Sequence, residues 1–107
     1  MLYEYRVYEA TPGRLGDLNR RFETLTLGVW ARHGIEAVGF WTAEVGDSNT
    51  LYYLLRWQDM ADRERKWAAF LADPAWREGR AKTEENGPLT VKIHNAFWRP
   101  TSYSPLT

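Results

Sequence analysis

The stretch of residues 34–57 constrains the fold of this chain more than any other part of its sequence. Two runs rich in β-branched and aromatic side chains, residues 35–45 and 50–57, lie on either side of the loop GDSN at 46–49. Two such runs joined by a short loop of turn-forming residues are typical of a β-hairpin. Because this hairpin is too apolar to lie against water, we expect other parts of the protein to cover both of its faces.

Two more strands are predicted outside the hairpin. Residues 2–9 alternate between the two sides of an extended chain, and residues 89–98 form another run of strand-forming side chains. The last segment, residues 99–107, contains two prolines and no periodicity, so we expect an extended tail.

A long helix is predicted between the first strand and the hairpin. Thr11 offers an N-cap and Pro12 a first helical position, and apolar residues at steps of three and four continue towards a stop at Gly34. The side of this helix that is expected to face solvent carries Arg14, Asp17, Arg20, Arg21 and Glu23.

Two further helices follow the hairpin. The first begins at Asp59, with Asp62 three residues later as a weaker form of the capping box. The pair Asp73-Pro74 ends this helix and begins the next, which runs to about residue 85. The resulting order, βαββαβ with a split second helix, predicts a ferredoxin-like α+β fold in which helices cover one face of a four-stranded antiparallel sheet. A chain of 107 residues has the length of one domain, which we place at 1–107 with the tail at 99–107.

Odd and even positions divide the predicted strands into two faces. The odd positions are nearly all apolar, as a helix-covered face requires: Tyr3, Tyr5, Val7, Trp41, Ala43, Val45, Leu51, Tyr53, Leu55, Trp57, Val91, Ile93 and Phe97. The even positions mix apolar and charged side chains: Leu2, Glu4, Arg6, Tyr8, Val38, Phe40, Thr42, Glu44, Tyr52, Leu54, Arg56, Lys92, His94 and Trp98. Such a face is too apolar for water and too charged for an ordinary core. We therefore predict that two copies pack sheet against sheet as a homodimeric α/β barrel.

Composition argues against several classes of function. The formal net charge is zero, with 14 basic and 14 acidic residues, whereas nucleic-acid binders normally carry a basic excess, so no nucleic-acid partner is predicted. The absence of cysteine removes disulfides, thiolate catalysis and cysteine-based metal sites. The sequence shows neither a leader segment after Met1 nor an apolar run long enough for a membrane span, so a cytoplasmic protein is expected. Since it also lacks phosphate-binding glycine loops and HExxH, no cofactor and no metal are predicted.

Three segments closely resemble the NIPSNAP family: RHGIEAVGFWTAEVGDSNTLYYLLRW, ADRERKWAAFLADPAW and WRPTSYSPL. The resemblance covers essentially the whole chain. It implies membership of the dimeric α/β-barrel superfamily, which also contains small antibiotic-biosynthesis-type monooxygenases, and it implies a homodimer. The eukaryotic members of the family are linked to vesicle traffic and mitochondrial quality control, and no common reaction is established for the small single-domain members. Where the family often has a His followed two residues later by a Trp, this chain has Tyr53 and Leu55, so the resemblance does not carry the role of that imidazole over to this chain. Tyr53 itself is kept as a candidate catalytic residue.

The two histidines are the other catalytic candidates. His33 could act as a general base or as a metal or haem ligand, but a histidine at a helix C-terminus, followed by Gly34, is more often a helix-ending residue. His94 lies on the even face and is expected to point into the dimer barrel near Glu4 or Arg6, where it could titrate near neutral pH or simply form an interface hydrogen bond.

The charged residues of the even face are the most informative group. We expect Arg6 and Arg56 to lie close together, with Glu4 and Glu44 as counter-charges, in a Glu–Arg network on the barrel side of the sheet. Such a network could fix the register between subunits or bind an anionic ligand.

The aromatic residues have two interpretations. The set Trp30, Trp41, Tyr53, Trp57 and Trp67 could line a pocket between helices and sheet, or form an ordinary core. The ligand-binding candidates are therefore Arg6, Glu44, Arg56, Trp41 and Trp67.

Two functions remain open. The first is a homodimeric small-molecule-binding or interaction module without catalysis, with a small apolar or anionic ligand. The second is a small enzyme, cofactor-free or haem-binding and similar to the antibiotic-biosynthesis monooxygenases, that acts on an apolar or aromatic substrate in the helix–sheet pocket.

Overall fold

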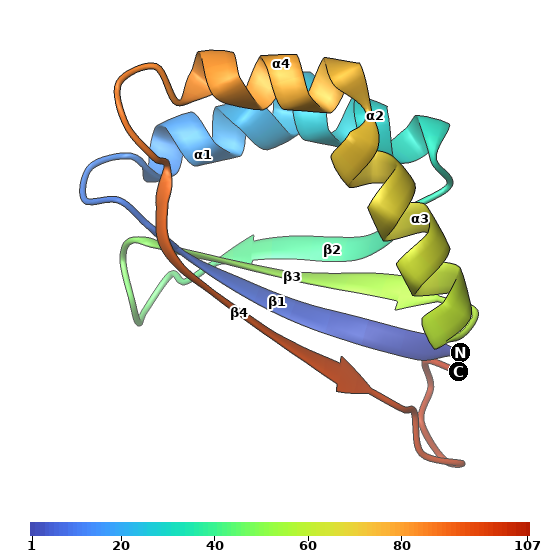
Figure 1. Ribbon diagram of the computed structural model, residues 1–107. Helices are drawn as coiled ribbons and strands as arrows, with labels where there is room; N and C mark the ends of the chain where they lie inside the picture. Colours follow the sequence, from blue (N-terminus) through green and yellow to red (C-terminus); the bar gives the residue numbers. More distant parts are fainter.

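The computed structural model describes all residues from 1 to 107, and its elements follow the predicted order (Figure 1). They are β1 (Leu2–Ala10), α1 (Leu15–Arg21), a π-helical turn η1 (Phe22–Thr26), α2 (Leu27–Arg32), β2 (Glu36–Thr42), β3 (Thr50–Trp57), α3 (Met60–Ala72), α4 (Pro74–Thr83) and β4 (Thr90–Trp98). The strands form one antiparallel sheet in the order β2-β3-β1-β4. All helices lie over one face of this sheet, and the other face is left open (Figure 1). The predicted ferredoxin-like α+β fold is confirmed.

The caps that were read from the sequence hold α3 and α4 in place. The Asp59 carboxylate accepts a hydrogen bond from the Asp62 N–H at 2.8 Å, and the Asp62 carboxylate accepts one from the Gln58 N–H at 2.9 Å. This is a reciprocal capping box made by two aspartates. Asp73 in turn accepts a hydrogen bond from the Ala75 N–H at 2.8 Å and begins α4.

The predicted start of the first helix is wrong. The helix begins at Leu15 instead of Pro12. The Thr11 hydroxyl donates to the Pro88 carbonyl at 2.6 Å and accepts no hydrogen bond from the first turn. Gly13 then takes a left-handed conformation, with φ of 78°, that a helix cannot contain. The residues that were expected to form the first turn of the helix therefore connect the end of β1 to the segment before β4.

The π-helical turn η1 changes which side chains of this helix face inwards. Its wider turn brings Arg21 and Thr26, five residues apart, onto the inner side, and the Thr26 hydroxyl donates to the Arg21 carbonyl at 3.4 Å. Arg21 is only 5% exposed, so its predicted place on the solvent side is wrong. Helix α4 packs closely against this turn: a Cβ atom on Gly79 would lie 2.5 Å from the Leu25 side chain.

The parity prediction is wrong for β1 and for part of β2. The antiparallel register pairs Arg6 with Tyr53, so an even residue of β1 shares a face with an odd residue of β3. The helix-covered face of the two central strands carries Glu4, Arg6, Tyr8, Leu51, Tyr53 and Leu55. In β2 the register shifts between Ala37 and Gly39, which turns Phe40 towards the helices and leaves Trp41 on the open face, 54% exposed.

The prediction that Glu4, Arg6, Glu44 and Arg56 form one network on the barrel side of the sheet is therefore wrong. Arg6 lies under the helices, whereas Arg56 lies on the open face and approaches Glu36 at 3.7 Å. Glu44 is exposed in the loop after β2, because that strand ends at Thr42 and not at residue 45.

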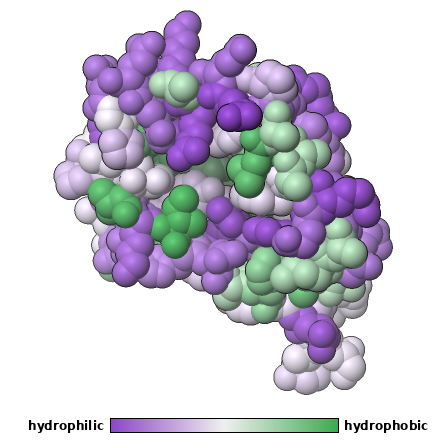
Figure 2. Space-filling view, in the orientation of Figure 1, coloured by the Kyte–Doolittle hydropathy of each residue, from purple (hydrophilic) through white to green (hydrophobic).

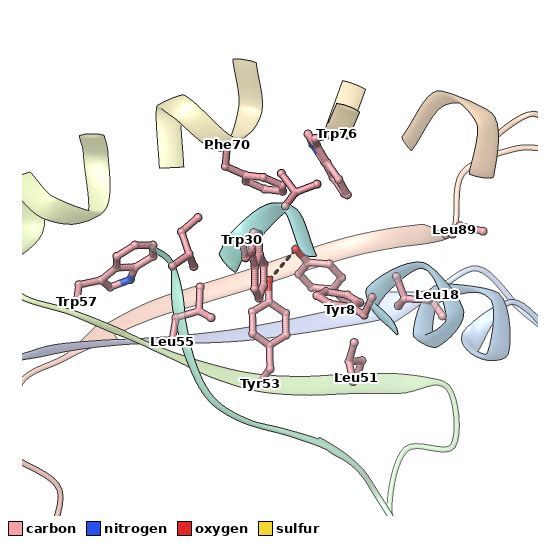
Figure 3. Close-up of a cluster of buried hydrophobic side chains, with 14 residues drawn as sticks. Tyr8, Leu18, Trp30, Leu51, Tyr53, Leu55, Trp57, Phe70, Trp76 and Leu89 are labelled. Atoms are coloured by element: carbon pink, nitrogen blue, oxygen red, sulfur yellow. Dashed lines mark hydrogen bonds between the residues drawn. The ribbon is translucent and has the colours of Figure 1, made fainter. Parts of the chain in front are cut away.

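Half of the 14 buried residues that form the core between sheet and helices are aromatic (Figure 3). Phe22 and Trp30 pack edge to face with ring centroids 5.6 Å apart, and Phe22 lies 5.4 Å from Tyr53. Phe70 of α3 and Trp76 of α4 close the cluster above them, with centroids 4.6 Å apart. Nearly all of this packing sits over the centre of the sheet, and β4 is the strand that the helices cover least (Figure 1).

The tail does not run straight away from the sheet. A turn joins the Thr101 carbonyl to the Ser104 N–H at 3.1 Å, and the chain then returns to the open face. There the Thr107 carbonyl accepts hydrogen bonds from Tyr3 and Arg56, both at 3.2 Å.

Among the helices of the structure, none has the length and apolar character that crossing a membrane requires.

Candidate functional site

A buried carboxylate on β1 anchors the polar side of the core. Glu4 is fully buried, and its two oxygens accept hydrogen bonds from Arg6 at 2.8 Å, Asn95 at 3.0 Å, Arg63 at 3.1 and 3.2 Å, and Trp57 at 3.2 Å. Burial by itself would raise the pKa of Glu4, but the hydrogen bonds from Arg63, Asn95 and Arg6 outweigh burial and lower the pKa. The carboxylate is therefore ionised and fixes the guanidinium groups of both arginines.

Arg6 joins this carboxylate to two tyrosines. Its Nε donates to the Tyr53 hydroxyl at 2.6 Å, and its Nη2 donates to the Tyr8 hydroxyl at 3.2 Å. The Tyr53 hydroxyl donates its own proton to the Tyr8 oxygen at 2.8 Å (Figure 3). Tyr8 thus accepts two hydrogen bonds, and its own proton has no partner within the protein.

The charges within this group agree with that direction of donation. Burial, together with the nearby Tyr8, raises the pKa of Tyr53 well above its usual value, although Arg6 acts in the opposite sense. Burial would lower the pKa of Arg6, but its contacts with Tyr53, Tyr8 and Glu4 raise it. The guanidinium stays charged and both tyrosines serve as hydrogen-bond partners of a cation.

A cavity of about 170 Å³ lies beside the Tyr8 hydroxyl, between β1, β4 and the helices. Figure 2 shows the surface hollowed in this region, between the helices and β4. The walls of the cavity combine aromatic and aliphatic side chains with arginines and hydroxyl groups: Arg6, Tyr8, Arg21, Phe22, Thr26, Trp30, Trp67, Phe70, Leu71, Trp76, Arg80, Thr90 and Ile93. The volume is close to that of the roughly 150 Å³ protein cavities that hold one benzene ring.

The wall of this cavity is rich in donors and contains no carboxylate. Besides the free proton of Tyr8, the Trp30 indole N–H and the Arg21 Nε–H are buried without any hydrogen-bond partner. A buried donor without a partner costs about 1–3 kcal/mol, so a protein rarely keeps two beside one space without a use for them. A molecule that carries oxygen acceptors suits these walls.

The π-helical turn supplies one side of the cavity. Arg21, Phe22 and Thr26 all line it, and the wider turn places Arg21 and Thr26 on the same inner side. Single π-helical turns inside α-helices occur frequently at functional sites. The irregular part of this helix therefore lies at the cavity.

A second ionic group lies where the cavity meets α4. Arg21 Nη1 lies 3.1 Å from Glu84 Oε2 and donates to the Thr83 hydroxyl at 3.4 Å. Arg80 Nε lies 3.6 Å from the other oxygen of Glu84, and the Arg21 guanidinium lies over the Trp76 ring at 5.4 Å. An open groove of about 510 Å³ continues outwards from there along α4.

Two of the predicted site residues, Arg6 and Trp67, line the cavity, and a third, Tyr53, contacts Arg6 behind its wall. Arg6, Tyr53 and Trp67 lie within one group, and the Arg6 Cζ atom is 4.6 Å from the centre of the Trp67 ring. Trp41 and Arg56 lie on the open face, and Glu44 lies in a loop. The structure thus separates a set of candidates that the sequence placed together.

Neither histidine lies at the cavity. His33 ends α2, and its Nε2 lies 2.7 Å from Asp73 Oδ2. The contacts of Asp73 with His33 and Arg32 lower its pKa to about 2. His94 lies on the open face, 3.9 Å from Glu9, and not near Glu4 or Arg6 as expected. No group of three or more His, Asp and Glu side chains is arranged to hold a metal ion.

Sequence reasoning missed Tyr8, Arg21 and Arg63 as site residues. Antiparallel pairing between β1 and β3 would have indicated Tyr8. It aligns Tyr8 with Leu51 and so places the even-numbered residues of β1 on the face that the helices cover. Arg21 follows from the π-helical turn, for which the sequence has no recognisable signal.

Comparison with known proteins identifies the chain's relatives. A family model described as NIPSNAP matches residues 3–105. A protein NipSnap homolog of Dictyostelium discoideum is 36% identical over 86 residues, which are 79% of this chain and 37% of that protein. This chain therefore spans little more than a third of the length of that curated relative.

Solved structures show the same fold. A protein from Agrobacterium tumefaciens, Atu4242, has a TM-score of 0.88 at 25% identity, with 100% of both chains covered. An uncharacterised NIPSNAP-like domain protein from Burkholderia xenovorans has a TM-score of 0.86 at 28% identity, covering 97% of this chain and 88% of that one.

A more distant likeness concerns the fold alone. SnoaB, a cofactor-independent oxygenase from Streptomyces nogalater, has a TM-score of 0.62 at 14% identity, covering 97% of this chain and 96% of that one. The family match, in contrast, extends over nearly every residue, from β1 through the cavity to the tail. The chain belongs to the NIPSNAP family.

Proposed function

We propose that this protein is a single-domain, homodimeric binding module for a small molecule of about one aromatic ring that carries an oxygen acceptor. The ligand lies in the cavity between sheet and helices. The observation that carries this proposal is the Tyr8 hydroxyl, whose proton has no partner beside a ring-sized space without carboxylates. A ligand oxygen would complete its hydrogen bonding.

The surroundings of Tyr8 favour binding because they are already in place. Glu4 holds Arg6, and Arg6 holds both tyrosine hydroxyls, so no side chain of this group has to be ordered when a ligand arrives. Donation from a guanidinium to the Tyr8 oxygen also polarises its O–H bond and strengthens it as a donor. The aromatic walls, such as Trp67 and Phe70, suit a flat ligand.

The open face of the sheet supports the homodimer. It carries Tyr5, Val7, Trp41, Tyr52, Leu54 and Trp98, of which Trp41 and Trp98 are about half exposed. Tyr5 and Trp98 stack at 4.7 Å and form a flat apolar surface. Continuous exposed apolar surface of this kind marks an interaction site, and a second copy of the same face would cover it.

The binding proposal is tested with two ring-sized probes, benzamide and benzoate, followed by tryptophan fluorescence and thermal shift. We expect benzamide to bind through its amide oxygen, and Tyr8→Phe to weaken that binding about three- to tenfold, which is the value of one hydrogen bond. Tyr103→Phe is the matched control, because Tyr103 is an exposed residue of the tail. If neither probe binds, or if Tyr8→Phe changes nothing, the proposal is wrong.

A second candidate function is catalysis on an apolar or aromatic substrate without a cofactor. The chain of hydrogen bonds from Arg6 through Tyr53 to Tyr8 favours it, because such a chain can deliver a proton to a bound substrate or receive one from it. The fold likeness to an oxygenase gives it further support. Oxygen uptake and product analysis with dihydroxyarenes would reveal such an activity, and Tyr8→Phe should abolish it.

A haem does not fit this cavity. Neither His33 nor His94 lies at its walls, and its volume of about 170 Å³ is that of a single small ring. The enzymatic alternative is therefore proposed without a haem.

A further inference from the structure

The mouth of the cavity, where it opens towards α4, has more positive than negative charge. Arg21 and Arg80 both line the cavity, and both approach the same carboxylate, that of Glu84. One carboxylate cannot neutralise two guanidinium groups. An excess of positive charge therefore remains beside a space whose lining contains no acidic side chain.

Most of the N–H groups of Arg21 make no hydrogen bond within the protein. Only its Nη1 makes hydrogen bonds, to Glu84 and Thr83, and its buried Nε has no partner. Arg21 is nevertheless 5% exposed, and an arginine that is withdrawn from water normally uses its donors fully. Its guanidinium also lies over the Trp76 ring, which fixes the plane of the group. A guanidinium fixed in this way, with donors to spare, is suited to a carboxylate.

The local fold brings the two arginines together. Arg21 faces inwards only because the π-helical turn follows it, and α4 approaches that turn closely at Gly79, next to Arg80. The outer groove shares Leu71, Trp76 and Arg80 with the inner cavity, so the two spaces adjoin at these side chains. A ligand that enters from the groove passes Arg80 and Glu84, which both line the groove, and meets Arg21 and Tyr8 further inside.

We propose that the ligand is a small aromatic acid whose carboxylate is bound at the mouth by Arg21 and Arg80. Its ring lies in the inner cavity, and the oxygen that accepts from the Tyr8 hydroxyl is a second one, carried by the ring. This inference rests on the proposed function and adds to it the charge of the ligand and the residues that select for it. Arg6 is not the anion-binding arginine, because the buried Glu4 carboxylate already balances its charge and each of its three nitrogens already donates to Glu4, Tyr53 or Tyr8.

The test compares benzoate with benzamide, a pair of nearly equal shape that differs in charge. We expect benzoate to bind at least about tenfold more tightly, since a hydrogen bond to a charged group is stronger than one between neutral groups. Arg80→Gln should weaken benzoate about tenfold and leave benzamide unchanged, and Arg21→Gln should do the same. Arg20→Gln is the matched control: it removes the same charge from the neighbouring, exposed position and should change neither affinity.

Each other outcome has a definite meaning. Equal affinities for the two probes would overturn this inference and leave the proposed binding function standing. Failure of both probes to bind would overturn the two together. A preference for benzoate that survives Arg80→Gln would place the carboxylate elsewhere and overturn the assignment of the mouth. Arg80 is largely exposed, so this variant is expected to fold even if Arg21→Gln does not.

Discussion

On the helix-covered face of the sheet, Glu4 accepts hydrogen bonds from four side chains, whereas on the open face Glu36 meets only Arg56, at 3.7 Å. Both faces carry acidic, basic and aromatic residues. What differs is enclosure: the first group is withdrawn from water and each charge has a fixed partner, while the second is half exposed and loosely paired. Residue type alone therefore does not distinguish the enclosed group from the open face; the number and geometry of the partners do.

The largest effect should come from removing the charge of Glu4. Glu4→Gln leaves Arg6 and Arg63 without their carboxylate, and losing one partner of a buried ion pair costs about 3–5 kcal/mol of the free energy of unfolding. Glu36→Gln, the same change on the open face, should cost less than about 0.5 kcal/mol. Urea denaturation measures both. Equal losses would remove the distinction between the two faces.

The next effect concerns the open face. We expect the protein at micromolar concentration to have about twice its 12.5 kDa mass in size-exclusion chromatography with light scattering. Trp98→Ala, which removes one ring of the Tyr5–Trp98 stack, should weaken dimerisation by about 2–4 kcal/mol without unfolding the chain. A wild-type protein that stays monomeric would show that this face has another partner or none.

A smaller effect is expected from two adjacent tyrosines of β3 that face opposite ways. Tyr53→Phe removes the acceptor of Arg6 Nε and should cost about 1–3 kcal/mol of the free energy of unfolding. Tyr52→Phe, on the open face, should change it by less than about 0.5 kcal/mol. Urea denaturation of the two variants measures both losses. A larger loss for Tyr52→Phe than for Tyr53→Phe would contradict the assignment of these two side chains to opposite faces of β3.

The smallest effect lies outside both faces. The contacts with His33 and Arg32 lower the pKa of Asp73 to about 2, below its usual 3.8. Because a lowered carboxyl pKa favours the folded state only while the group is ionised, this contribution is complete above about pH 4 and is lost as the pH falls through 2. Asp73→Asn keeps a capping side chain and removes the charge, so its melting temperature should differ slightly from wild type above pH 4 and converge with it near pH 2. A difference that persists at pH 2 would point to the cap instead.

Local sequence patterns determined the order of elements and several of their ends. The hairpin at 34–57, the caps at Asp59 and Asp73, and the glycine stop at Gly34 are where the sequence places them. These features depend on interactions between residues a few positions apart, such as a side chain and the first turn of its own helix. The ferredoxin-like order then follows, because few topologies satisfy it.

The tertiary structure alone decided which side chains meet. Glu4, Arg6 and Tyr8 face the helices because antiparallel pairing with β3 aligns even positions with odd ones, and Trp41 is turned outwards by the register shift in β2. The inward turn of Arg21 depends on a π-helical turn that packing against α4 accommodates. Register and packing are set by contacts between residues far apart in the chain. The residue types of the site were therefore visible in the sequence, but the cavity they surround became visible only in three dimensions.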